Sequence, residues 1–185
     1  INRGEIHIVE PDLDAYVSSA VSQGMLAAYT EVMPADVYII CVPTPFRSCE
    51  ATPTPNIDYV KAAAISISPH IKAGDIVILE STSPVGTTDL IRDVLIQQGV
   101  NVDEIHIAYC PERVLPGKIM IELVQNDRVV GGVNIESTVA VAEFYRTFVR
   151  GEVLETGART AEMCKLTENS YRDVNIAFAN ELSMI

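Results

Sequence analysis

Residues 76–87 read Ile76-Val77-Ile78-Leu79-Glu80-Ser81-Thr82-Ser83-Pro84-Val85-Gly86-Thr87, and this stretch decides the fold class. Its four leading apolar residues have the length of a strand that is covered on both faces of a sheet. The polar turn that follows leads directly into a helical pattern from Thr87 to Gln98. A buried strand, a short turn and a helix form the repeating unit of an α/β protein.

The same unit recurs on both sides of this stretch. The other apolar runs of strand length are Val37–Val42, Ile105–Tyr109, Val129–Val130 and Val153–Leu154. The other helical patterns are Ile57–Ile71, Ser137–Val149 and a long one from about Thr160 onward. This alternation predicts a doubly wound, parallel, Rossmann-like sheet with right-handed crossovers. One long irregular loop is predicted from Cys49 to Asn56, where proline and threonine gather.

The glycines indicate that this sheet is incomplete. A dinucleotide-binding domain carries G-x-G-x-x-G in its first strand–helix turn, and none of the ten glycines stands in that motif. Either the fold binds no dinucleotide, or its first strands precede Ile1. The chain starts without methionine and ends at Ile185 inside a helical pattern, so we favour the second reading and expect an excerpt of a longer protein. The best domain boundary lies near Gly157.

Composition excludes several classes of function. The chain is 48% hydrophobic and 21% charged, as in an ordinary soluble globular protein. Its net charge of -12 argues against a nucleic-acid partner, because neutralising phosphates requires clustered Lys and Arg. No apolar run approaches the roughly 18 residues that span a membrane. The four cysteines and three histidines lack metal-ligand spacing, so we expect no metal and a reducing, cytoplasmic location.

Three polar loops follow the predicted strands, namely Val42–Pro45, Ser81–Gly86 and Pro111–Gly117. Ligands of open parallel sheets bind beyond the carboxyl ends of the strands. Each loop alone is typical of ordinary turn chemistry, but three at one edge favour a binding site. The second loop precedes a helix, so its amides and hydroxyls either hold a phosphate or carboxamide or form a plain N-cap. Sequence does not separate these two.

The third loop contains Glu112 and Arg113 side by side. At the mouth of a site, the carboxylate is suited to holding a water or acting as a base, and the guanidinium to gripping an anionic substrate. The alternative is an ion pair at the surface.

The last helical pattern carries two stripes of side chains. Lys165, Asn169 and Arg172 are spaced i, i+4, i+7 on one stripe, which is suited to holding a reacting oxygen in a cleft. About 150° away, a second stripe is apolar and suited to packing. Its members are Tyr171, Val174, Phe178, Leu182 and Ile185. A plain solvated face would also satisfy the polar stripe. Cys164 faces away from Lys165 and is expected to be a small buried hydrophobe.

Together these motifs resemble the UDP-glucose/GDP-mannose dehydrogenase family. The resemblance rests on the three loops, on Glu162-x-x-Lys165-x-x-x-Asn169, and on Asn2-Arg3-Gly4 with Glu10-Pro11-Asp12-Leu13. The Glu-Arg-Val-Leu-Pro-Gly form of the third loop is most similar to the branch of UDP-N-acetylmannosamine dehydrogenases, which feed enterobacterial common antigen and related polysaccharides.

The resemblance implies a reaction and its site residues. Members oxidise a sugar C6 alcohol to a carboxylate in two steps with two NAD, through a cysteine thioester. By motif, Thr44 and Thr82 are expected to contact NAD, and Glu112 to position water or the nicotinamide. The residues expected to bind the UDP-sugar are Arg113, Val114, Lys165, Asn169 and Arg172. Lys165 and Asn169 are also expected to stabilise the oxyanion, and Lys165 to move a proton.

The resemblance also implies an organisation. Residues 1–157 would be the C-terminal part of an NAD-binding domain, and residues 158–185 the start of a central dimerisation helix, so a homodimer or higher homo-oligomer is expected. The glycine-rich turn and the ribose-binding acid would precede Ile1, and the nucleophilic cysteine, in Gly-Gly-x-Cys, would follow Ile185. The fragment alone is therefore expected to be inactive.

Two alternatives remain open at this level. The β-hydroxyacid dehydrogenases share a Ser-Thr turn and a Lys-x-x-x-Asn helix, but their glycine-rich segment before the lysine is replaced here by Gly157-Ala158-Arg159-Thr160. The other alternative is a non-catalytic fragment that serves dimerisation or nucleotide-sugar binding.

Overall fold

The structure is a computed structural model, and it describes residues 1–47 and 52–185. Its strands are β1 (Val37–Ile40), β2 (Phe46–Arg47), β3 (Thr54–Pro55), β4 (Ile76–Leu79), β5 (His106–Tyr109), β6 (Arg128–Gly132) and β7 (Val153–Gly157). Its helices are α1 (Leu13–Ser22), α2 (Asp58–Ile67), α3 (Thr87–Gln97), α4 (Ile119–Gln125), α5 (Ile135–Arg146) and α6 (Ala158–Leu182). Two 3-10 turns are η1 (Ser68–His70) and η2 (Val102–Glu104).

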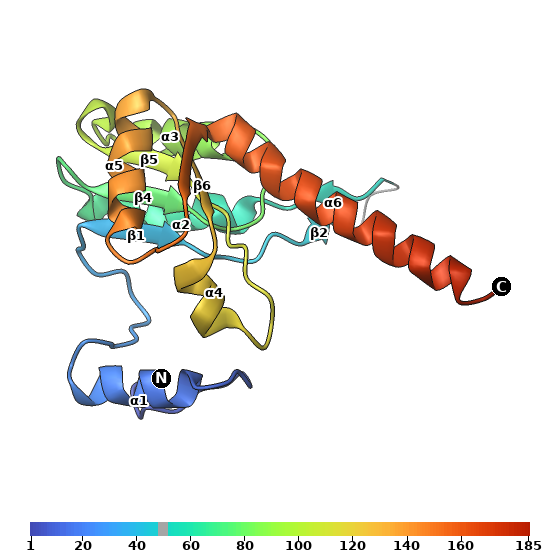
Figure 1. The fold of residues 1–185 in the computed structure, drawn as a ribbon. Coiled ribbons are helices and arrows are strands. Elements are labelled where there is room, and N and C mark those ends of the chain that lie inside the picture. Colours follow the sequence, from blue (N-terminus) through green and yellow to red (C-terminus); the bar gives the residue numbers. More distant parts are fainter. Residues whose placement is uncertain (48–51) are drawn as a thin grey trace.

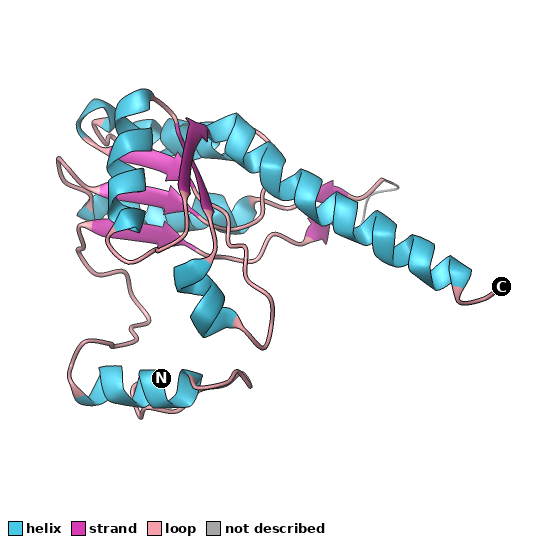
Figure 2. Ribbon diagram, viewed as in Figure 1, coloured by secondary structure: helices cyan, strands magenta, loops and turns pink. Residues whose placement is uncertain are grey.

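The main sheet has the strand order β1-β4-β5-β6-β7 and is covered on both faces (Figure 2). Side chains alternate along each strand, so Val77 and Leu79 pack with α2 and α3 on one face. Ile78, between them, packs with α5 on the other. All three are fully buried, which confirms the prediction of a strand covered on both faces. The α/β, Rossmann-like fold class is confirmed.

Strand direction corrects one part of that prediction. β1, β4 and β5 are parallel, but β6 runs antiparallel to β5, and β7 is parallel to β6. A wholly parallel sheet is therefore wrong for the last two strands. A parallel neighbour needs a connection that crosses one face of the sheet. After Tyr109 the chain instead forms a loop and α4, and β6 starts at the end of the sheet where β5 finishes.

A short ribbon and two helices also differ from the predictions. The expected irregular loop contains a short antiparallel ribbon, in which Phe46 pairs with Pro55 and Arg47 with Thr54. Strands of two residues are too short to show periodicity, so the sequence did not reveal them. The part of that loop at residues 49–51 lies outside the described residues. Helices α1 and α4 were also not predicted.

Helix α6 begins directly on the sheet, at Ala158. A Cβ atom at Gly131 would stand 2.5 Å from the carbonyl oxygen of Gly157 and 2.8 Å from the Cβ of Ala161, so only glycine permits this approach. The first turns of α6 are buried here, including Glu162 and Lys165. The rest of the helix extends away from the sheet (Figure 1), and the predicted apolar stripe on it is exposed in this chain. The domain boundary at residue 157 stays a prediction.

The N-terminal segment, residues 1–31, lies apart from the sheet, beside α4 (Figure 1), whereas Val32 and Ala35 pack against the core of the sheet. None of the residues of α1 is buried. The segment is closed on itself by two hydrogen bonds, from Asn2 Nδ2 to the Ala28 carbonyl oxygen (2.8 Å) and from the Ala28 N–H to Asn2 Oδ1 (2.6 Å). Across residues 1–47 and 52–185, no helix is both long and apolar enough to cross a membrane.

Candidate active site

The loops after β1, β4 and β5 meet at one edge of the sheet, as predicted, because these parallel strands are neighbours. The Thr44 hydroxyl donates to the carbonyl oxygen of Thr82 at 2.6 Å. The Val42 N–H donates to Ser81 Oγ at 2.8 Å. The first two loops therefore form one unit, and the two threonines expected to contact NAD lie side by side.

The N-terminus of α3 is occupied by Glu162, which belongs to one of the sequence motifs but had no predicted role. The Glu162 carboxylate, fully buried on α6, accepts from the N–H of Gly86 (2.6 Å), the N–H of Thr88 (2.8 Å) and the hydroxyl of Thr88 (2.7 Å). A carboxylate is favourable at this positive end of a helix dipole. The cap of α3 therefore comes from a residue on α6 and not from a Ser or Thr of the loop, and the amides of Gly86 and Thr88 are already bonded. A phosphate or carboxamide beside the other amides and the hydroxyls of the loop stays a prediction.

Lys165 and Glu112 are brought together, as the predicted roles require. Lys165 Nζ donates to the backbone carbonyl oxygen of Glu112 at 2.5 Å and stands 3.8 Å from the carboxylate oxygen Oε2. The other carboxylate oxygen accepts from the N–H of Val114. Lys165 is only 8% exposed. An ammonium held by one carbonyl at the base of a loop keeps donors available for an oxygen placed beside it.

Arg113 forms an ion pair, but not with its neighbour Glu112. Its Nε and Nη2 donate to the two carboxylate oxygens of Glu168 on α6, at 3.2 and 2.5 Å. This two-pronged geometry fixes the plane of the guanidinium. No role was predicted for Glu162 or Glu168, although they stand three residues before and after Lys165 on the same side of the helix.

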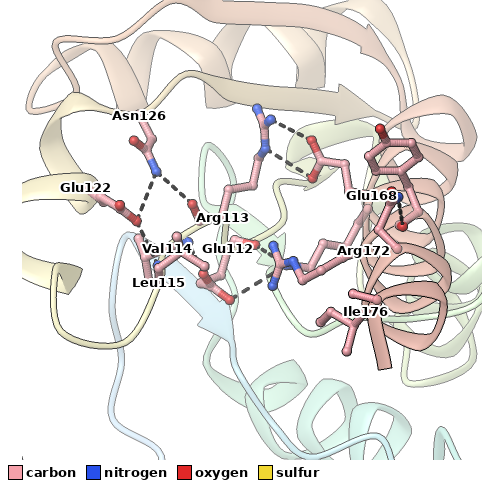
Figure 3. A pocket seen from close by; sticks show the side chains of 13 residues that line it. Glu112, Arg113, Val114, Leu115, Glu122, Asn126, Glu168, Arg172 and Ile176 are labelled. Carbon is pink, nitrogen blue, oxygen red and sulfur yellow. Dashed lines mark hydrogen bonds and ion pairs between the residues drawn. The ribbon is translucent and has the colours of Figure 1, made fainter. Parts of the chain in front are cut away.

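A cavity of about 670 Å³ lies between the third loop and α6 (Figure 3). Six residues were predicted to act in catalysis or to bind the sugar nucleotide, and five of them line this cavity, namely Glu112, Arg113, Val114, Lys165 and Arg172.

Three other predicted positions do not line this cavity. Asn169 is exposed and is not among the lining residues, since the face of α6 towards the cavity is centred between Glu168 and Arg172. Thr44 and Thr82 also lie outside it. Tyr171, expected on the packing stripe, lines the cavity instead. The residue spacing predicts which side chains share a face of α6. The rotation of α6 relative to the third loop decides which of these faces lines the cavity.

The thiols near this edge are protonated at neutral pH. Cys41 and Cys110 directly follow β1 and β5. Burial raises the pKa of the Cys41 thiol to about 12, and the nearby Glu80 carboxylate acts in the same direction. Burial also raises the pKa of Cys110 to about 12. A neutral thiol is a poor nucleophile, so neither residue is suited to covalent catalysis. Cys164 is only partly buried, and the part of the chain that is described contains no His/Cys/Asp/Glu cluster for a metal.

Comparison with known proteins now identifies the family. Residues 1–149 match the model of the UDP-glucose/GDP-mannose dehydrogenase family, NAD binding domain, and residues 159–185 match that of its central domain. The chain belongs to the UDP-glucose/GDP-mannose dehydrogenase family.

Relatives in this family are similar over the whole chain. It is 55% identical to the NDP-N-acetyl-D-galactosaminuronic acid dehydrogenase of Ralstonia nicotianae, covering 100% of the chain and 45% of that protein. It is 54% identical to the UDP-N-acetyl-D-mannosamine dehydrogenase of Yersinia pestis, with 100% and 46% covered. The chain thus spans less than half the length of these relatives.

Solved structures of the family agree with the fold. The UDP-N-acetyl-mannosamine dehydrogenase Cap5O from Staphylococcus aureus matches with a TM-score of 0.88 and 46% identity, covering 98% of this chain and 44% of that one. The UDP-D-ManNAc dehydrogenase from Pyrococcus horikoshii matches with a TM-score of 0.90 and 39% identity, with the same shares covered.

NAD is the cofactor of this dehydrogenase family, and the described residues fit part of it. Thr44 and Thr82 present hydroxyls at the carboxyl edge of the sheet, where dinucleotides bind. The amides of Gly86 and Thr88 are already bonded to Glu162 and are not available to its phosphates.

Proposed function

We propose that this chain is part of an NAD-dependent UDP-sugar 6-dehydrogenase that oxidises UDP-N-acetylmannosamine at C6 to the uronate, for surface polysaccharide biosynthesis. The observation that carries the proposal is the cavity in which Lys165, Glu112 and Arg172 converge. Family membership and the names of the relatives support the reaction class. They also speak against a β-hydroxyacid dehydrogenase.

Lys165 is the proposed centre of the chemistry. NAD, when bound, supplies the hydride acceptor. The buried Lys165 ammonium, held by the Glu112 carbonyl, would stabilise charge that develops on the sugar C6 oxygen and move its proton. Asn169, one turn further along α6, is proposed to help hold that oxygen. Thr44 and Thr82 are proposed to contact NAD.

The substrate-binding roles divide between the third loop and α6. Arg172 is exposed at the cavity and is suited to binding the diphosphate of a nucleotide sugar. Arg113, fixed by Glu168, and Val114 are proposed to contact the sugar nucleotide from the opposite wall. Glu112 is proposed to position a water, because only one oxygen of its carboxylate accepts from the N–H of Val114.

The remaining parts of the reaction are proposed to come from other residues of the whole protein. A thioester requires a reactive thiol, and the raised pKa values of Cys41 and Cys110 argue against both of these. We therefore expect a Gly-Gly-x-Cys nucleophile elsewhere and no complete reaction from residues 1–185 alone. Among residues 1–47 and 52–185, β1 is an edge strand of the main sheet, and its outer edge is suited to pairing with strands that carry the glycine-rich turn.

Location and assembly follow the same proposal. The exposed apolar residues on α6, among them Val174, Phe178 and Leu182, support a homodimer or higher homo-oligomer. A nucleotide-sugar substrate and NAD support a cytoplasmic location.

A substrate comparison tests the proposed sugar. Initial rates of the whole protein would be measured with NAD and UDP-N-acetylmannosamine, UDP-N-acetylgalactosamine, UDP-N-acetylglucosamine or UDP-glucose. We expect kcat/KM for UDP-N-acetylmannosamine to exceed that for UDP-glucose by at least about 100-fold, because a site that hydrogen-bonds the N-acetyl group rejects a sugar that lacks it. A preference for UDP-N-acetylgalactosamine would overturn the sugar but leave the reaction class in place.

A further inference from the structure

Side chains form hydrogen bonds with the backbone of the third loop at Glu112, Arg113, Val114, Leu115 and Gly117. Asn126 Nδ2 donates to the carbonyl oxygen of Arg113 at 2.7 Å, and Glu122 Oε2 accepts from the N–H of Leu115 at 2.7 Å. Glu122 lies on α4, which follows the loop directly, and Asn126 is the C-cap of that helix. The wall that carries Arg113 and Val114 therefore depends on where α4 lies.

Helix α4 is in turn anchored by a residue more than a hundred positions earlier. Glu10 Oε2 accepts from the N–H of Gly117 at 2.9 Å, and Glu10 Oε1 accepts from the N–H of Ile119 at 2.8 Å. Both oxygens of one carboxylate are thus used at the junction of loop and helix. Gly117 has a φ of 89°, the left-handed conformation that favours glycine, so the loop turns sharply where Glu10 holds it.

Glu10 is exceptional within its own segment. It is 7% exposed, whereas the adjacent Val9 is fully exposed and Ile8 is 46% exposed. The rest of the N-terminal segment lies apart from the sheet (Figure 1). A charged side chain that is buried alone in an exposed segment needs partners, and the amides of Gly117 and Ile119 supply them.

We propose that Glu10 is a positioning residue for the nucleotide-sugar side of the cavity: it ties the N-terminal segment to Gly117 and Ile119 and so sets the place of Arg113 and Val114. The proposal rests on the proposed function. Because Glu10 reaches the loop after β5 and not the threonine-bearing loops after β1 and β4, its effect should fall on the sugar and spare NAD.

The test is Glu10→Gln in the whole protein, with Glu5→Gln as the matched control. Glutamine keeps one acceptor but turns an amide N–H towards a backbone N–H, so one of the two hydrogen bonds to Gly117 and Ile119 is lost. We expect KM for the nucleotide sugar to rise about tenfold, while kcat and KM for NAD stay within about twofold. Glu5 is exposed on the same segment, and Glu5→Gln should change none of these values.

Hydrogen–deuterium exchange provides a readout that needs no substrate. Amides of residues 115–119 should exchange faster in Glu10→Gln than in the parent, with the amides of β4 unchanged. An unchanged sugar KM, or an equal rise in the KM for NAD, would overturn the assignment of Glu10. If the parent oxidised no nucleotide sugar at all, the proposed function would fail instead. The exchange result would still decide whether Glu10 holds the amides of Gly117 and Ile119.

Discussion

Replacing Lys165 with methionine is expected to lower kcat for nucleotide-sugar oxidation by about 1000-fold, the scale seen when a donor to a developing oxyanion is removed. Methionine keeps most of the aliphatic volume of the buried side chain, so the cavity wall should stay packed. What is lost is the ammonium, which bonds to the Glu112 carbonyl oxygen and lies beside its carboxylate. Steady-state rates of the whole protein with saturating NAD measure the effect.

Lys61→Met is the matched control for this change. Lys61 lies on α2, away from the cavity lining, so its loss should leave kcat within about twofold of the parent. Thermal midpoints of both variants should remain close to that of the parent. If Lys165→Met retained a tenth or more of the parental kcat while folded, Lys165 would not be the group that stabilises the reacting oxygen.

Gly131→Ala is expected to destabilise the protein by at least about 3 kcal/mol, the upper range for overpacking, because no side-chain rotation relieves the clash. The added Cβ would meet the carbonyl carbon of Gly157 at 2.7 Å and its oxygen at 2.5 Å. These backbone atoms start α6, so the helix must move off the sheet and take Glu162 and Lys165 with it. Urea denaturation of the whole protein gives the change in its midpoint.

The neighbouring glycine supplies the control. A Cβ at Gly157 meets nothing within 4 Å, and its φ of -85° is ordinary for any residue. Gly157→Ala should therefore change the free energy of unfolding by less than about 0.5 kcal/mol. Equal stability of the two alanine variants would show that α6 does not depend on its close approach to β6.

Local patterns predicted much of this molecule. The apolar run at residues 76–79 predicted the central strand β4 with its correct bounds, and the neighbouring apolar runs predicted β1 and β5. Strands that are buried on both faces are apolar at every position, so they are visible as unbroken runs in the sequence. The three polar loops were placed at one edge because parallel neighbours must end there. The spacing of Lys165 and Arg172 placed both on the cavity side of α6.

The rest depended on contacts between residues far apart in the sequence. The direction of β6 depends on how the chain returns after Tyr109, which no local periodicity encodes. Glu162 caps a helix 74 residues away, and Glu10 holds a loop 107 residues away. Spacing also could not decide that Tyr171 faces the cavity and Asn169 does not, because this depends on how α6 is rotated against the third loop.

The most direct test of the proposed reaction counts NADH formed per sugar consumed. The whole protein would be given limiting UDP-N-acetylmannosamine and excess NAD, and the NADH absorbance followed to its end point. Oxidation of an alcohol to a carboxylate removes four electrons and each NAD accepts two, so we expect two NADH per sugar. A plateau at one NADH per sugar would contradict the account, because it would mean an alcohol dehydrogenase that stops at the aldehyde.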